Sequence, residues 1–109
     1  MSASFAPRKE TDILREISLY LKWRKVFFWR INTTGIFDPR RRIFLKSPNT
    51  TPGVADLVCL KAGKLVALEV KSPTGKQRPE QKEFEDNIKR NGGEYHLVRS
   101  VQDVINVGL

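Results

Sequence analysis

The sequence predicts an α/β domain in which a mixed β-sheet is flanked by α-helices. Segments with helical spacing of apolar residues alternate with short β-branched and aromatic runs, in the order α-β-(β)-β-β-α-β-α. The chain has 109 residues, which suffices for one core of modest size. It shows no internal repeat and no domain boundary, so residues 1–109 are expected to form a single domain, with residues 1–6 disordered.

The N-terminal half begins with a predicted helix that Pro7 opens and that continues to about Arg24. Residues 26–31 alternate imperfectly between apolar and polar, which predicts a strand, and residues 32–35 mark a turn. Residues 36–46 have the weakest structural signal, which is compatible with a short hairpin. The apolar positions of the predicted helix are spaced three and four apart and are Ile13, Leu14, Ile17, Tyr20 and Leu21.

The C-terminal half begins with two predicted strands, residues 56–60 and 65–71, joined by a turn at residues 62–64. A second helix starts at Pro79, places Phe84 and Ile88 on one face, and ends at Gly92-Gly93. Residues 95–98 predict another strand. The segment Ser100-Val-Gln-Asp103 is typical of a capping box, which predicts a short final helix.

The charge of the chain indicates an anionic partner. A net charge of +8 and a pI near 10 favour phosphates, either of nucleic acid or of an anionic membrane. The basic residues are spread through loops and strands, which favours nucleic acid over a membrane, although a merely solvated surface has the same composition. No apolar run is long enough to span a bilayer or to form a signal peptide. The single Cys59 provides no disulfide framework and fits a reducing cytoplasm.

Two carboxylates and an ammonium stand at adjoining ends of the predicted strands. Asp56 begins one strand, and Glu69 and Lys71 end the next, so an antiparallel hairpin brings them together. Mg²⁺ takes one or two carboxylates with further oxygens, and the carbonyl of Val70 is placed to add one. Lys71 points to the same side as Glu69, where it can reach a scissile phosphate. The alternative for Glu69 and Lys71 is a solvated salt bridge.

Asp56 followed by Glu69-Val70-Lys71 resembles the signature of the PD-(D/E)xK nuclease superfamily. More narrowly, the chain resembles a stand-alone virus-type replication-repair nuclease (VRR-NUC) domain. One departure is Ala55, where the superfamily often has proline, a position that carries no ligand. The stretches that carry the resemblance are Trp29 to Pro39, Pro52-Gly-Val-Ala-Asp56, Glu69-Val-Lys71, Gly75-Lys76 with Pro79-Glu-Gln81, and Gly92-Gly-Glu-Tyr95 with Val98 to Asp103.

The resemblance implies a restriction-endonuclease-like core and an endonuclease that uses Mg²⁺ or Mn²⁺. It implies Asp56, Glu69 and the Val70 carbonyl as metal ligands and Lys71 as the catalytic lysine. It also implies a further acid on the first helix. At about 100° per residue, Glu10 falls within about 20° of the apolar face and Glu16 about 100° away, so we favour Glu10 and keep Glu16 in reserve. The alternatives are a favourable helix N-terminal acid for Glu10 and a surface charge for Glu16.

Gln81, near the start of the second helix, is a further active-site residue that the resemblance implies. Its amide can hydrogen-bond the lysine, a water or a phosphate without titrating. The alternative is an ordinary polar residue of a first helical turn.

Exposed basic loops are expected to follow the DNA backbone on either side of the cut. Trp29 and Phe28 are candidates for stacking on bases, although their apolar neighbours are more typical of a core. Asn32 and Thr33 are weak candidates for phosphate contacts. The basic residues predicted to bind nucleic acid are Arg40, Arg41, Arg42, Lys46, Lys76 and Arg78.

Several other chemistries are not supported by the sequence. Gly75-Lys76-Gln77 lacks the rest of a P-loop, so no nucleotide cofactor is expected. His96 is the only histidine and Cys59 the only cysteine, too few for a zinc site. Stand-alone members of the resembled family are homodimers that cut branched DNA such as four-way junctions, and they suggest a phage or bacterial origin. A flap- or restriction-like nuclease and a non-catalytic nucleic-acid-binding module remain as alternatives.

Overall fold

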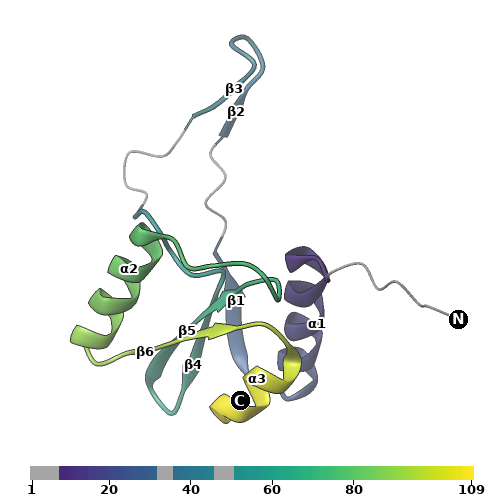
Figure 1. The fold of residues 1–109 in the computed structure, drawn as a ribbon, viewed down its shortest axis with the longest axis vertical. Helices are drawn as coiled ribbons and strands as arrows, with labels where there is room; N and C mark the ends of the chain where they lie inside the picture. Colours follow the sequence, from purple (N-terminus) through teal and green to yellow (C-terminus); the bar gives the residue numbers. More distant parts are fainter. Residues whose placement is uncertain (1–7, 32–35, 46–50) are drawn as a thin grey trace, which may run out of the picture.

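The structure, a computed structural model, describes residues 8–31, 36–45 and 51–109. It confirms the predicted α/β fold, with three helices and a four-stranded mixed sheet (Figure 1). The elements in chain order are α1 (Glu10–Trp23), β1 (Phe27–Arg30), β2 (Ile36–Asp38), β3 (Ile43–Leu45), β4 (Leu57–Lys61), β5 (Lys64–Val70), α2 (Pro79–Arg90), β6 (Glu94–Val98) and α3 (Val101–Val107).

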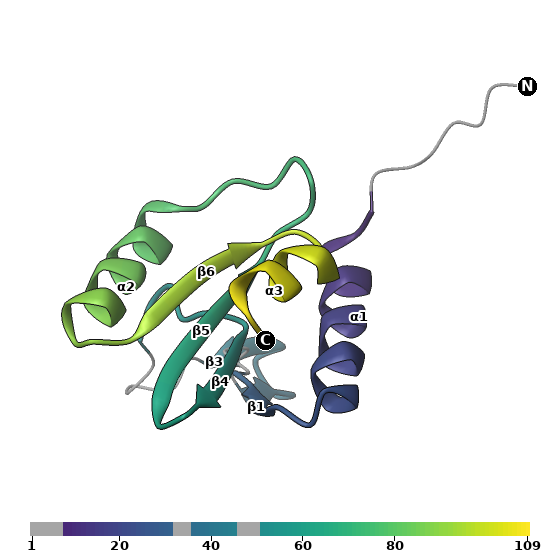
Figure 2. The same ribbon diagram turned by 90° about the horizontal axis from the view of Figure 1, so that it is seen from below.

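The sheet has the strand order β1-β4-β5-β6. β4 pairs antiparallel with both β1 and β5, whereas β5 and β6 are parallel because α2 crosses between them. α1 and α3 lie on one side of the sheet and α2 on the other (Figure 2). β2 and β3 form a separate antiparallel hairpin that stands away from this sheet (Figure 1).

The main core lies between α1, α3 and the sheet. Four of the five predicted apolar positions of α1 are buried, and the fifth, Tyr20, packs against the same cluster. Alternate residues of the strands form the sheet side of this core, because every second side chain of a strand lies on the same face. The buried members from the sheet and the C-terminal segment are Leu57, Cys59, Val66, Leu68, Val70, Val98, Val104 and Leu109.

A smaller core lies on the other face, under α2. Ala55, Ala67 and Tyr95 are buried there, and Phe84 and Ile88 of α2 pack against them as the sequence predicts. Within the helices and strands described, α2 covers only part of this face. Phe27 and Leu60 on the β1 side stay 68% and 42% exposed. This uncovered part lies near the β4–β5 turn, at the opposite end of these strands from Asp56 and Glu69.

Local signals fix the ends of most elements. Ala62 and Gly63 both have positive φ, as a two-residue type I′ hairpin turn requires. Ser100 Oγ accepts a hydrogen bond from the Asp103 amide, which confirms the predicted cap of α3. One boundary differs: α1 begins at Glu10 after Lys9, not at Pro7. Pro7 and residues 1–6 lie outside the described residues. None of the described helices is long and apolar enough to cross a membrane.

Candidate active site

The register of the sheet brings Asp56 next to Glu69. Leu57 pairs with Leu68 in antiparallel β4 and β5, so the residue before Leu57 lies opposite the residue after Leu68. Asp56 is held there by its own side chain, because its Oδ2 accepts a hydrogen bond of 2.8 Å from the amide of Val70. The predicted meeting of strand ends is confirmed.

Glu69 is a buried carboxylate whose two oxygens differ. Its Oε1 accepts a hydrogen bond of 2.8 Å from Gln81 Nε2 and lies 3.7 Å from Lys71 Nζ. Its Oε2 is buried and has no hydrogen-bond partner among the described residues. Glu69 is 2% exposed and Lys71 8%, so the pair is not the solvated salt bridge of the alternative interpretation. A buried carboxylate oxygen without a partner costs free energy, and a bound cation would remove that cost.

The environment of Glu69 disfavours its charged form. The pKa of this carboxyl is raised to about 8; burial is the largest cause, the nearby Asp56 charge also raises it, and the Lys71 ammonium opposes both. The Glu10 charge also contributes to the raised pKa. The site therefore concentrates negative charge in a place where one ammonium does not compensate for it.

The oxygen atoms of the site fit a hard divalent cation. Within residues 8–31, 36–45 and 51–109, no three His, Cys, Asp or Glu side chains are close enough to hold a metal by themselves. Mg²⁺, however, needs only one or two carboxylates. The N–H and C=O of an extended residue point to the same neighbouring strand, so the Val70 carbonyl is on the Asp56 side. Asp56, Glu69 and Val70 thus offer the oxygens that the sequence predicts.

Gln81 is buried, and both ends of its amide are used. Its Oε1 accepts a hydrogen bond of 2.9 Å from the Arg78 amide at the start of α2, while its Nε2 holds Glu69. Gln81 is therefore not an ordinary polar residue of a first helical turn, because its side chain is 3% exposed and connects the helix to the sheet. Gln81 is a positioning residue for Glu69, and in this arrangement it does not bond Lys71.

Gly53 lets the loop before Asp56 approach the first turn of α2. It has φ +72°, and a Cβ at this position would lie 2.2 Å from the Glu80 carbonyl oxygen and 2.7 Å from the Gln81 amide nitrogen. Only glycine fits such an approach. The contact ties the segment that carries Asp56 to the helix that carries Gln81.

The two acids of α1 have different surroundings. Glu16 forms an ion pair with Arg8, as expected of a surface charge. Glu10 is exposed at the first turn, and its charge acts on Glu69. The structure therefore favours Glu10 as the acid nearest the site, although it is not in a three-acid cluster.

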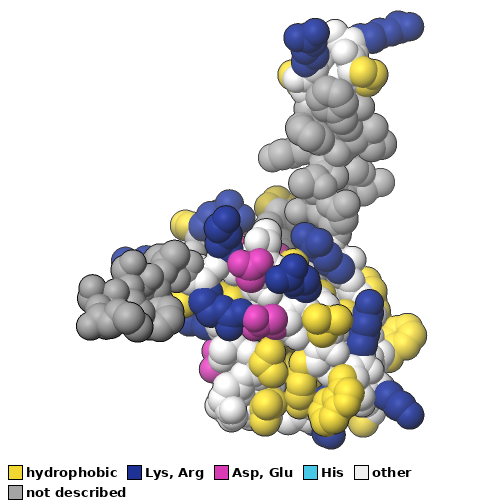
Figure 3. All heavy atoms as spheres, turned by 90° about the vertical axis from the view of Figure 1, so that its right-hand side faces the viewer, with side chains coloured by type: hydrophobic (Ala, Val, Ile, Leu, Met, Phe, Trp, Pro, Cys, Tyr) yellow, Lys and Arg dark blue, Asp and Glu magenta, His cyan; other side chains and the backbone are white. Residues whose placement is uncertain are grey.

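The basic residues predicted to bind nucleic acid occupy two places. Lys76 and Arg78 are exposed on the loop between Lys71 and α2, where Arg78 Nε lies 3.2 Å from Glu80 Oε1. Arg40, Arg41 and Arg42 are exposed at the tip of the β2–β3 hairpin. Lys46, Asn32 and Thr33 lie outside the described residues. In Figure 3, Lys and Arg side chains surround a few acidic ones in the upper part of the body, above a gathering of hydrophobic side chains.

The two aromatic candidates of β1 face opposite sides of the sheet. Phe28 packs against the main core, which agrees with the structural interpretation. Trp29 is 41% exposed on the face that carries Glu69 and contacts Phe27 edge-on, with ring centroids 5.7 Å apart. Trp29 alone stays available for stacking.

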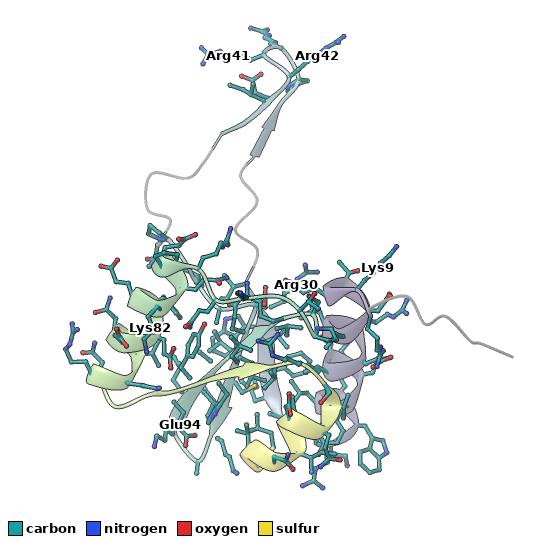
Figure 4. The ribbon with its side chains drawn as sticks, viewed as in Figure 1. Lys9, Arg30, Arg41, Arg42, Lys82 and Glu94 are labelled. Atoms are coloured by element: carbon teal, nitrogen blue, oxygen red, sulfur yellow. The ribbon has the colours of Figure 1, made fainter. Side chains whose placement is uncertain are left out.

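Sequence reasoning missed Arg99 and Arg30. Arg99 Nη1 donates hydrogen bonds of 2.5 Å to the Ser72 carbonyl and 2.7 Å to the Gly75 carbonyl, so it fixes the loop that follows Lys71. Its only sequence signal is its position before the Ser100 cap. Arg30 ends β1 next to the Asp56 backbone, and Figure 4 places it at the same end of the body as Lys9.

Compared with known proteins, the chain matches no family model and no curated sequence. The function is therefore argued from the geometry of the site.

Proposed function

We propose that this protein is a Mg²⁺- or Mn²⁺-dependent DNA endonuclease that hydrolyses phosphodiester bonds. The observation that carries the proposal is the buried Glu69 carboxylate. One of its oxygens is held by Gln81, the other has no partner among the described residues, and Asp56 and Lys71 lie beside it. A structural salt bridge has no need of a second acid, the half-buried Asp56, at the same place.

Each residue has a distinct part in this mechanism. Asp56, Glu69 and the Val70 carbonyl would hold the cation, which supplies Lewis-acid activation of the scissile phosphate and of the attacking water. Gln81 fixes the direction of Glu69. Lys71, 3.7 Å from Glu69, is placed to stabilise the negative charge that develops on the phosphate oxygens in the transition state.

The preferred substrate is branched DNA such as a four-way junction, and the active form is a homodimer in a reducing cytoplasm. The support for branched DNA and for the dimer is the resemblance to stand-alone VRR-NUC domains. A two-fold dimer suits a junction, because it presents two sites to paired strands. The net charge of +8 supports a nucleic acid as the substrate.

Two other functions compete with this one. A flap- or restriction-like nuclease would use the same site on another DNA shape. A non-catalytic binding module would use the fold without the chemistry. The buried Glu69 and the half-buried Asp56 disfavour the module, because carboxylates beside bound DNA repel phosphates unless a cation lies between them.

Cleavage of end-labelled DNA tests the proposal. The substrates are a four-way junction, a flap, a linear duplex and a single strand, each in Mg²⁺ and in Mn²⁺. The variants are Asp56→Asn, which can still accept the Val70 hydrogen bond, and Lys71→Met, which removes the ammonium and keeps an unbranched side chain. Lys64→Met is the matched control, because Lys64 is exposed at the opposite end of β5.

We expect symmetric cutting of the junction by the wild type and by Lys64→Met, with a loss of about 10²–10³-fold in rate for Lys71→Met. If only the flap or the single strand is cut, the proposed active site stands and the proposed substrate is wrong. Binding of every substrate without cutting in either metal overturns the nuclease and favours the binding module.

A further inference from the structure

The tip of the β2–β3 hairpin is a turn with a defined shape. Asp38 pairs with Ile43 across the two strands, which leaves residues 39–42 as the turn. Asp38 Oδ1 accepts hydrogen bonds from the backbone amides of Arg40, at 3.0 Å, and Arg41, at 3.4 Å. A side chain that bonds its own backbone two and three residues on holds a turn in one conformation.

The turn carries more positive charge than its surroundings compensate. Arg40, Arg41 and Arg42 are consecutive and exposed, and Asp38 is the acid that faces them. Arg41 Nε lies 3.8 Å from Asp38 Oδ2, and the Arg41 side chain is still 73% exposed. Three consecutive guanidinium groups on one short turn, of which Arg41 lies near the Asp38 carboxylate, repel one another, and a bound polyanion would relieve that repulsion.

Arg42 occupies a backbone conformation that does not suit arginine. Its φ is +53°, in the left-handed region where glycine and asparagine are favoured. The shape of the turn gives no reason for arginine here, since glycine would adopt the same conformation without strain. Ala62 adopts a similar positive φ in the β4–β5 turn, so the conformation assigns no role by itself; the charge and exposure of the Arg42 side chain indicate a use outside the chain.

The hairpin also leaves the body at the end where the candidate site lies. It is inserted between the end of β1 and the start of β4, and Asp56 immediately precedes β4. Figure 4 shows Arg41 and Arg42 at the far tip, Arg30 and Lys9 at the near end of the body, and Glu94 at the opposite end.

We propose that the β2–β3 hairpin is an arm that grips the phosphates of duplex DNA away from the scissile bond. Arg40, Arg41 and Arg42 make these contacts, and Asp38 holds their backbone in place. Guanidinium groups bind phosphate oxygens in pairs, and a two-stranded β-ribbon is narrow enough to enter the major groove. That DNA is the ligand rests on the proposed function, but the arm contributes binding and is not needed for the chemical step.

Salt-dependent binding tests the arm. The full chain with Glu69→Gln, in EDTA so that nothing is cut, is titrated against a fluorescent duplex of about 24 base pairs at several salt concentrations. Arg40→Ala, Arg41→Ala and Arg42→Ala are combined in one variant. The control variant combines Lys64→Ala, Lys89→Ala and Arg90→Ala. These residues carry the same charge near Glu94, because Lys64 Nζ lies 3.9 Å from Glu94 Oε1 and Lys89 and Arg90 end α2 shortly before β6.

Each phosphate contact contributes about 0.9 to the slope of log K against log salt. We expect the arm variant to lower this slope by up to about 3 and the affinity at about 0.1 M salt at least tenfold. The control should change both far less. Equal effects in the two variants would overturn the arm, because the arginines would then act only through net charge.

Arg42 provides a test that separates contact from stability. Arg42→Gly relieves the backbone strain and should leave the melting temperature unchanged or higher, while it weakens binding and lowers the slope by about 1. Arg42→Lys keeps the charge and should restore most of the slope. Unchanged binding in Arg42→Gly would exclude Arg42 from the arm.

The arm and the nuclease fail in different ways. A chain that binds with the expected slope but cuts no substrate retains the arm and loses the nuclease. If the wild type cuts DNA but the arm variant has an unchanged salt slope, the nuclease proposal stands and the arm proposal is wrong. If the chain with its arginines intact binds no duplex, the arm is overturned.

Discussion

At the scale of single residues, the Glu69 carboxylate lowers the stability of the fold, although the proposed function needs it. A carboxylate that is 2% exposed, with one oxygen unpartnered among the described residues, costs folding free energy when no cation is bound. Glu69→Gln removes the charge and keeps the shape. In EDTA we expect this variant to be more stable than the wild type by about 1–3 kcal/mol, measured by urea unfolding, and inactive in cleavage.

The pH dependence of the stability difference shows whether Glu69→Gln is more stable because it loses a buried charge or because it packs better. Burial raises the pKa of Glu69 from 4.5 to about 8, so between these values the folded state binds a proton that the unfolded state has lost. The stability of the wild type therefore falls as the pH rises from about 4.5 to about 8, and that of Glu69→Gln lacks this fall. The advantage of the variant should be larger at pH 8.5 than at pH 5. An advantage that is equal at both would contradict the buried charge.

Addition of Mg²⁺ should make the wild type more stable than Glu69→Gln. A cation that binds only the folded state raises the melting temperature of the wild type by mass action and leaves Glu69→Gln unchanged. Calorimetry of both proteins with and without Mg²⁺ measures this directly. A rise of equal size in both proteins would place the cation elsewhere.

At the scale of elements, the geometry of the candidate site depends on how closely the Gly53 loop approaches α2. Gly53→Ala places a methyl group 2.2 Å from the Glu80 carbonyl oxygen, in addition to the strain of its positive φ. Gly63→Ala is the matched control, because Gly63 has φ +80° but nothing within 4 Å of the added carbon. Both are measured by urea unfolding.

We expect about 2–5 kcal/mol of destabilisation for Gly53→Ala and about 1–2 kcal/mol for Gly63→Ala. The difference isolates the close approach from the backbone strain. Gly53→Ala should also weaken Mg²⁺ binding, since the shift of α2 moves Gln81 away from Glu69. Equal losses of stability in the two variants would show that the approach itself contributes nothing.

The elements that local patterns specify could be predicted, and the contacts between distant elements could not. Apolar runs rich in β-formers, with turn residues between them, predicted β4 and β5 and with them the meeting of Asp56 and Glu69, because a hairpin is a local structure. The bond from Gln81 to Glu69 depends on where α2 docks on the sheet, so it was not predicted; the resemblance implied Gln81 as a site residue but with other partners. The β2–β3 hairpin was compatible with the pattern but not specified, since its turn uses arginine where glycine is usual.

At the scale of the whole molecule, the basic charge and the candidate site act together only if the assembly presents them to one DNA. Arg30 and Lys9 lie at the end of the body from which the arginine hairpin extends, and Glu94 lies at the other (Figure 4). DNA would therefore approach from the end where Asp56 and Glu69 are. Under the proposed function, a single copy would offer one such site and would cut one strand at a time.

Two sites in one assembly predict a particular product pattern on a four-way junction. A mixed dimer, with one intact copy and one Lys71→Met copy, can be isolated through different affinity tags. It should nick one strand and release little resolved duplex. The wild-type dimer should cut both strands before it dissociates. A cruciform in a supercoiled plasmid separates these outcomes, because one nick gives an open circle and paired cuts give a linear product. If the mixed dimer resolves the junction as fully as the wild type, or if only monomers are found, cutting does not need paired sites and the two-fold assembly is not the active form.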